Sequence, residues 1–109
     1  MTKTEIANML KSLKLPIAYY QFPNGEAPQL PYIVYYYPYS DNFSADNSVY
    51  QRADELNVEL YTENKNFTLE EAIESLLDEN GFFWQKSESY IESERMYQIS
   101  YEMETIING

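Results

Sequence analysis

Two stretches of the sequence alternate apolar and polar side chains, and this pattern constrains the fold more than any other feature. The apolar positions are Leu56, Val58 and Leu60 in the first stretch, and Tyr97, Ile99, Tyr101 and Met103 in the second. Because successive side chains of a strand point to opposite faces, residues 55–62 and 96–106 predict strands that are buried on one side only. Such strands are typical of an antiparallel sheet with one face exposed to water.

Two other segments have the spacing of amphipathic helices. Residues 3–14 begin with a capping box formed by Thr2 and Glu5 and end before Pro16. In the second segment, Thr68 and Glu71 predict another capping box, with Phe67 placed as a hydrophobic staple. Its apolar stripe consists of Leu69, Ala72, Ile73, Leu76 and Leu77, and Asn80-Gly81 is a typical helix end.

The remaining apolar runs are shorter and are bounded by turn residues. Residues 17–22 predict a strand that ends at Pro23-Asn24-Gly25, and residues 30–39 predict a strand delimited by Pro31 and Pro38. Residues 40–48 are rich in Asp, Asn and Ser and predict a long hairpin tip. After the tip, residues 50–53 resume the strand, which either continues or restarts over residues 55–62, and residues 82–90 form a hairpin with residues 96–106.

These elements follow the order α-β-β-β-β-α-β-β along a chain of 109 residues. No repeat, linker or low-complexity stretch divides the chain, and its length is that of one domain. We therefore expect a single α+β domain over residues 1–109, with long hairpins and with both helices packed on one face of a mostly antiparallel sheet.

The inventory of side chains excludes most kinds of catalysis. The chain has no Cys and no His, so it offers no disulfide and no thiolate or imidazole for a metal or a covalent intermediate. The carboxylate pairs at residues 70–71 and 102–104 are expected on exposed faces, and no acid is expected to be buried. Residues 41–46 lack the spacing of a calcium loop, and the three glycines form no phosphate loop. We expect no catalytic residue, no cofactor and no metal, and infer that the protein acts by contact.

Negative charge is concentrated in the second half of the chain. The formal net charge is −11, and residues 53–109 carry 14 acids against Lys65, Lys86 and Arg95, whereas residues 1–22 have a net charge of +2. This balance disfavours binding to duplex nucleic acid or to an anionic membrane. Seven of the 12 tyrosines lie between residues 19 and 39. Tyrosine suits strands that contact another chain, although sheets favour it in any case.

The first residues, MTKTEIANMLKSLK, have a polar residue at every second or third position and do not resemble a signal peptide. The sequence also has no apolar run long enough for a transmembrane helix. We expect an intracellular protein that has no contact with a membrane.

Four stretches of the chain carry a resemblance to a known family. They are LPYIVYYYPYSDNFSADNSVYQ, the strand ending in ELYTENK, the helix LEEAIESLLDENG and the hairpin FFWQKSESYIESERMYQISYEME. In pattern and order they resemble the small tail-terminator, or tail-completion, proteins of long-tailed phages and prophages of Gram-positive bacteria. The most specific parts are residues 39–43 with 45–47, and residues 78–81.

The resemblance implies a sheet flanked by helices, with hairpins that reach neighbouring subunits. It also implies a sixfold ring that sits on the last ring of tail-tube protein, stops tube growth and offers its other face to head-completion proteins. DNA would pass through the ring without specific binding. The protein would be assembled in the host cytoplasm and located in the virion, at the head-proximal end of the tail.

Two sets of residues are candidates for contacts in such a ring. The hairpin tip is predicted to contact a neighbouring subunit or the tail through Tyr39, Asp41, Asn42, Phe43, Asp46 and Asn47. The candidates for the wall of the lumen are Glu55, Glu59, Glu88, Glu92, Glu102 and Glu104. A negative wall would favour the passage of DNA, because cationic side chains would hold the phosphates.

Two other functions are compatible with the composition. An acidic mimic of DNA that inhibits a host DNA-binding protein would use the charge of −11, although Lys65, Lys86 and Arg95 interrupt the acids. A carboxylate-based hydrolase would need a buried acid, which the pattern does not predict. A terminator should cap tail tubes, whereas a mimic should bind a basic host protein in a strongly salt-dependent way.

Overall fold

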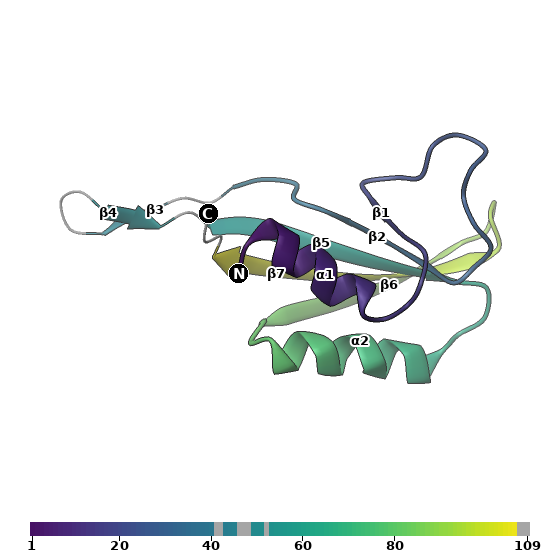
Figure 1. The fold of residues 1–109 in the computed structure, drawn as a ribbon. Helices are drawn as coiled ribbons and strands as arrows, with labels where there is room; N and C mark the ends of the chain where they lie inside the picture. Colours follow the sequence, from purple (N-terminus) through teal and green to yellow (C-terminus); the bar gives the residue numbers. More distant parts are fainter. Residues whose placement is uncertain (41–42, 46–48, 52, 107–109) are drawn as a thin grey trace.

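The computed structural model describes residues 1–40, 43–45, 49–51 and 53–106. Its main element is a five-stranded sheet in the order β1-β2-β5-β7-β6 (Figure 1). The strands are β1 (Ile17–Tyr19), β2 (Tyr32–Tyr36), β5 (Ala53–Thr62), β6 (Trp84–Ile91) and β7 (Met96–Ile106). Only β1 and β2 are parallel, and the other three pairs are antiparallel. The expected α+β class and mostly antiparallel sheet are confirmed.

Two of the strands are shorter than the sequence predicts. β1 ends at Tyr19 because Tyr20 has a φ of 70°, in the left-handed region that interrupts a strand. β2 begins after Pro31 and ends before Pro38, in agreement with the limits that proline sets.

The two helices are α1 (Lys3–Lys11) and α2 (Phe67–Glu79). The capping box of Thr2 and Glu5 is present at the start of α1. The predicted capping box at Thr68 is wrong: Asn66 is the N-cap, and its Oδ1 accepts from the backbone N–H of Leu69 at 3.0 Å. Asn is as good a cap as Thr, so α2 starts earlier and Phe67 lies 66% exposed instead of forming a staple.

The end of α2 follows the prediction. Gly81 has a φ of 78°, a backbone angle that residues other than glycine rarely adopt. The backbone N–H of Gly81 donates to the carbonyl of Asp78, and the backbone N–H of Phe82 donates to the carbonyl of Leu77, both at 3.0 Å. These two hydrogen bonds form a Schellman motif, which satisfies carbonyl groups at the end of α2. Phe82, which follows this helix end, is buried. The strand β6 begins two residues later, at Trp84.

The core lies between the helices and one face of the sheet. The alternating apolar residues of β5 and β7 are paired across the strands, as Val58 with Tyr101 and Leu60 with Ile99. They pack against Ile6, Met9 and Leu10 of α1 and against Ile73 and Leu77 of α2. Both helices thus cover the same face, as predicted, and the opposite face of the sheet carries no helix from the described part of the chain (Figure 1).

A short hairpin stands out beyond the end of the five-stranded sheet (Figure 1). Its strands are β3 (Phe43–Ala45) and β4 (Val49–Gln51), so the predicted tip itself contains a strand. At the base, Ser40 forms a bridge with Asp54, and the Ser40 hydroxyl donates to Asp54 Oδ1 at 2.6 Å. The N–H of Glu55 also donates to the carbonyl of Tyr39 at 2.9 Å. The chain on both sides of the hairpin is thereby attached to the body.

Shortening a side chain in the core should destabilise the protein. Leu77 is fully buried under α2, and Leu77→Ala should lower the free energy of unfolding by about 2–5 kcal/mol, because it leaves a cavity. Urea denaturation followed by circular dichroism measures this change. The exposed Glu79→Ala on the same helix is the control and should change the free energy by less than about 0.5 kcal/mol. Equal effects of the two variants would contradict this description of the core.

Candidate assembly surface

The face of the sheet that lies opposite the helices, which we call the open face, carries four of the six predicted lumen acids. Glu55 and Glu59 come from β5, and Glu102 and Glu104 come from β7. In the strand register, Glu55 lies opposite Glu104, and Glu102 lies opposite Asn57. Within the described strands, no Lys or Arg occupies an open-face position. The open face is therefore negative without a local counter-charge.

Three of these carboxylates are close enough to influence one another. Partial burial raises the pKa of Glu55, and the charges of Glu102 and Glu104 raise it further, against a hydrogen bond from Tyr39. Like charges directly opposite each other on neighbouring strands are destabilising. The pairing of Glu55 with Glu104 therefore does not serve the folding of the single chain.

Glu59 differs from the other three because its carboxylate is held by neighbouring side chains. Its Oε1 accepts from the Tyr61 hydroxyl at 3.1 Å, and its Oε2 accepts from Gln98 Nε2 at 3.1 Å and from the Tyr36 hydroxyl at 3.5 Å. Burial, followed by the charge of Glu59, raises the pKa of Tyr61, so this hydroxyl stays a neutral donor. Glu59 forms the centre of a hydrogen-bonded network across three strands.

Beyond Glu59, toward the β6–β7 turn, the open face becomes apolar and hollow. A depression of about 290 Å³ lies here, lined by Tyr20, Gln21, Phe22, Ala27, Tyr32, Val34, Tyr61, Ile91 and Met96. The ring of Tyr32 contacts that of Phe22 edge to face, with 5.1 Å between centroids, and lies 5.2 Å from the ring of Tyr61. The open face thus has an acidic end, a polar centre and an apolar end.

The outer strands of the sheet, β1 and β6, each expose one aromatic ring on the helix side. Tyr19 of β1 is 52% exposed and Tyr90 of β6 is 49% exposed. Each ring also packs inward, Tyr19 on Tyr35 at 5.3 Å and Tyr90 on Tyr97 at 4.9 Å between centroids. Such half-packed tyrosines are common anchors of protein interfaces.

The other predicted contact residues lie at the hairpin and the β6–β7 turn. Tyr39 is exposed at the base of the hairpin, and Phe43 begins β3. The predicted contact residues Asp41, Asn42, Asp46 and Asn47 lie outside the described residues. Glu92 lies in the β6–β7 turn. Glu88 lies on the helix side of β6, where it forms an ion pair with Lys65, and so does not join the acids of the open face.

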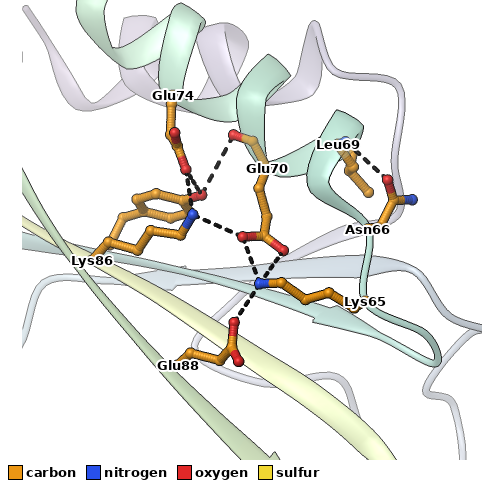
Figure 2. Close-up of polar contacts among 8 residues, drawn as sticks. Lys65, Asn66, Leu69, Glu70, Glu74, Lys86 and Glu88 are labelled. Atoms are coloured by element: carbon orange, nitrogen blue, oxygen red, sulfur yellow. Dashed lines mark hydrogen bonds and ion pairs between the residues drawn. The ribbon is translucent and has the colours of Figure 1, made fainter.

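The expectation that no acid is buried is wrong, because Glu70 and Asp54 are each only 1% exposed. Glu70 lies at the centre of an ion-pair cluster between α2 and β6 (Figure 2). Lys65 Nζ lies 2.7 Å from its Oε2, and Lys86 Nζ lies 2.8 Å from its Oε1. Lys86 also contacts Glu74 at 2.7 Å, and the Tyr101 hydroxyl donates to Glu74 at 2.8 Å.

Sequence reasoning missed these two acids for different reasons. Asp54 has the same parity as Leu56 and Val58 along β5, so the alternation itself placed it on the core side. Glu70 lies one turn before Glu74 and beside the apolar stripe of α2, and only the distant Lys86 makes its burial possible.

The cluster keeps Glu70 ionised. Burial opposes the charge of Glu70, but the hydrogen bonds and charges of Lys65 and Lys86 outweigh it and hold the pKa of Glu70 below its usual value. A general acid of a hydrolase needs the opposite shift. Glu70 therefore stabilises the packing of α2 against β6, and its lowered pKa does not suit a general acid.

Removing the charge of Glu70 should destabilise the protein in a pH-dependent way. At pH 7, Glu70→Gln should lower the free energy of unfolding by about 1–3 kcal/mol, because both ammonium groups lose their shared carboxylate. The pKa of Glu70 is lowered in the folded protein. The difference in free energy of unfolding between the natural chain and the variant should therefore have its full size above about pH 4.3, the pKa of Glu in the unfolded chain, and should decrease below that pH. Urea denaturation across pH measures it, with the exposed Glu71→Gln as control. A difference that is independent of pH would refute this role.

The described part of the chain has neither a cluster of metal ligands nor a membrane-spanning helix. It contains no group of three acidic side chains that could hold a metal ion. Neither of the described helices is long and apolar enough to cross a membrane.

Comparison with known proteins identifies a similar fold but no related sequence. No protein-family model matches the sequence, and no curated protein matches it either. Among solved structures, the chain is similar to a chain of the virion of a native gene transfer agent (GTA) particle, with a TM-score of 0.58 and 14% sequence identity. The similarity covers 92% of this chain and 84% of that chain. The two chains therefore share a fold over nearly their whole lengths.

Proposed function

We propose that this protein is a structural component of a phage-like virion, and specifically a tail terminator that forms a ring on the end of the tail tube. The observation that carries the proposal is the open face, a sheet surface that lacks a helix and bears carboxylates without a cation. The fold shared with a GTA virion chain and the resemblance of the sequence to tail-terminator proteins support the same assignment.

The geometry of the sheet suits a closed ring. β1 and β6 are the outer strands and run in opposite directions, as the pairings across the sheet require. Cyclic neighbours have the same orientation, so β1 of one copy would meet β6 of the next in an antiparallel arrangement. Such a contact joins two different surfaces, which is the condition for ring closure. The resemblance to tail terminators supplies the number of six copies.

The open face of each copy would form the inner wall of this ring. Its carboxylates, Glu55, Glu102 and Glu104, would face DNA that passes through the lumen. A wall without cations gives the phosphates no partner, so DNA is not held in transit. The helices would lie on the outside, and the hairpin of β3 and β4 would reach past the rim toward a neighbouring protein. In this role the protein needs contact surfaces only and has no catalytic activity.

The assignment to tail tubes can be tested with purified proteins. The tail-tube protein encoded in the same gene cluster is polymerised with and without this chain, and tube lengths are measured by negative-stain microscopy. The added chain should shorten the tubes and appear as a ring at one end. Tubes of unchanged length without added density would exclude a terminator. Salt-sensitive binding to a basic host protein in place of tubes would favour the DNA mimic instead.

The charge of the lumen can be tested separately. Glu102→Lys with Glu104→Lys should leave the thermal unfolding temperature nearly unchanged, because both side chains are exposed. Tails should still be completed, but DNA delivery should fall by at least about tenfold, because two cations per copy would hold the phosphates. The readout is the titre of particles that carry the variant. The matched variant Glu102→Gln with Glu104→Gln removes the same two carboxylates without adding a cation and should deliver DNA normally. Equal titres for both variants would count against a lumen at the open face.

A further inference from the structure

Two exposed lysines lie at and just beyond the end of α1, Lys11 and Lys14. Neither Lys11 nor Lys14 forms an ion pair with a residue of the described chain, whereas Lys3 pairs with Asp54. Lys3 Nζ also lies over the ring of Tyr37 at 4.7 Å, so this side of α1 faces the β2 edge of the core. Lys11 follows Lys3 after eight residues and lies on the same side of the helix.

Lys14 extends this positive surface to the edge of the sheet. Its N–H donates to the carbonyl of Lys11 at 3.0 Å, and β1 begins three residues later. The carbonyl of Pro16 accepts from the N–H of Ile33, which ties this segment to β2. Lys11 and Lys14 therefore form a positive flank beside the outer strand β1, which we call the lysine flank.

The opposite side of the molecule carries the complementary charge. Glu71, Glu74 and Asp78 follow one another at helical spacing along α2, and we call them the acidic flank. Two contacts show that this flank faces β6, because Glu74 contacts Lys86 and Asp78 Oδ1 accepts from Trp84 Nε1 at 2.8 Å. Lys65 and Lys86 neutralise only part of the charge here. The acidic flank, Glu70 and Glu88 supply five carboxylates against these two lysines.

The two flanks lie at opposite edges of the same helical layer. Through Lys3, α1 contacts Asp54 of β5 and Tyr37, which follows β2, whereas α2 runs beside β6 and contacts it through Glu70 and Lys86 (Figure 1). The lysine flank accordingly borders β1 and the acidic flank borders β6. The exposed rings of Tyr19 and Tyr90 lie at the same two edges. Each edge thus combines a charged flank with an aromatic anchor, and the two flanks have opposite charge.

We propose that the lysine flank of one copy docks on the acidic flank of the next copy. The proposal rests on the ring described above and adds the surfaces that join its subunits. The occupant of the acidic flank is a second copy of this chain, because that copy supplies two unpaired ammonium groups at the matching edge. The contact is directional, since like flanks repel each other and cannot pair in a two-fold dimer.

Charge reversal on both flanks tests this contact. Lys11→Glu with Lys14→Glu makes both flanks negative. Glu71→Lys, Ser75→Lys and Asp78→Lys together replace the negative excess beside β6 by a positive one, so both flanks become positive and the ion-pair cluster stays intact. Each variant alone should self-associate at least about tenfold more weakly than the natural chain, because like charges meet at every interface. Sedimentation velocity at low ionic strength measures the association, and added salt should weaken that of the natural chain.

Two combinations should restore assembly. In an equimolar mixture of the two variants, an alternating ring opposes unlike charges at every interface. The chain with all five substitutions likewise presents a negative α1 and a positive α2. Both should associate like the natural chain. Association of both variants at the natural strength, or failure of both combinations, would overturn the proposal.

A disulfide experiment tests the geometry directly, because the natural chain has no Cys. A chain with Lys14→Cys and Glu71→Cys should form, on mild oxidation, a ladder of covalent oligomers, whereas either single substitution should stop at dimers or monomers. Absence of the ladder would refute the proposed contact. If the chain caps tail tubes but forms no ladder, this interface is wrong and the proposed terminator function is unaffected. If the chain forms the ladder but does not cap tubes, the terminator function is wrong and the contact between the flanks is supported.

Discussion

The pairing of β5 with β7 is the constraint on which the rest of the structure depends. Ten consecutive residue pairs join the two strands, from Ala53 with Ile106 to Thr62 with Tyr97. Because side chains alternate in both strands, one register places the core residues of both strands, such as Leu56, Val58 and Ile99, on one face and all the open-face acids on the other. A slip of one residue would exchange the two faces. The hydrophobic core and the acidic surface therefore both follow from this one strand pairing.

The same pairing makes the molecule asymmetric in a way that favours directional assembly. Both helices pack on the apolar face of the sheet. The order of the strands places α1 on the side of β1 and α2 on the side of β6. The single net positive segment of the chain, residues 1–22, then lies at one edge and the acid-rich α2 at the other. A subunit with unlike edges cannot satisfy both of them in a two-fold dimer, but it can do so in a ring.

The sequence predicts those features that depend on local pattern. The bounds of β7, the capping box of α1 and the glycine end of α2 follow from side-chain alternation, a box motif and the conformational freedom of Gly81. Other features depend on competition or on distant partners. Asn66 and Thr68 are both capable caps, and propensity alone does not decide between them. The parallel pairing of β1 with β2 and the burial of Glu70 are fixed by elements far along the chain, which a local pattern cannot reveal.

The sequence also predicts part of the arrangement of the candidate surface. Alternation along β5 and β7 places Glu55, Glu59, Glu102 and Glu104 on one face, which agrees with the strand register. Alternation cannot separate Glu59, whose oxygens accept hydrogen bonds from tyrosine and glutamine side chains, from its exposed neighbours. It also does not show on which face Glu88 lies, because the residues of β6 are almost uniformly exposed, and only the register with β7 assigns Glu88 to the helix side.

The distribution of cations explains why the acids of the open face have no lysine or arginine partner among the described strands. Of the three cations in residues 53–106, Lys65 and Lys86 point toward Glu70 and hold α2 on the sheet. The third, Arg95, lies in the β6–β7 turn, where its φ is 52°. The lysines that could neutralise acidic surfaces are thus used inside the subunit or lie at the opposite edge, on α1. The two lysines beside the acidic flank neutralise only part of its charge, and in the proposed contact Lys11 and Lys14 of the next copy would supply the remaining positive charge.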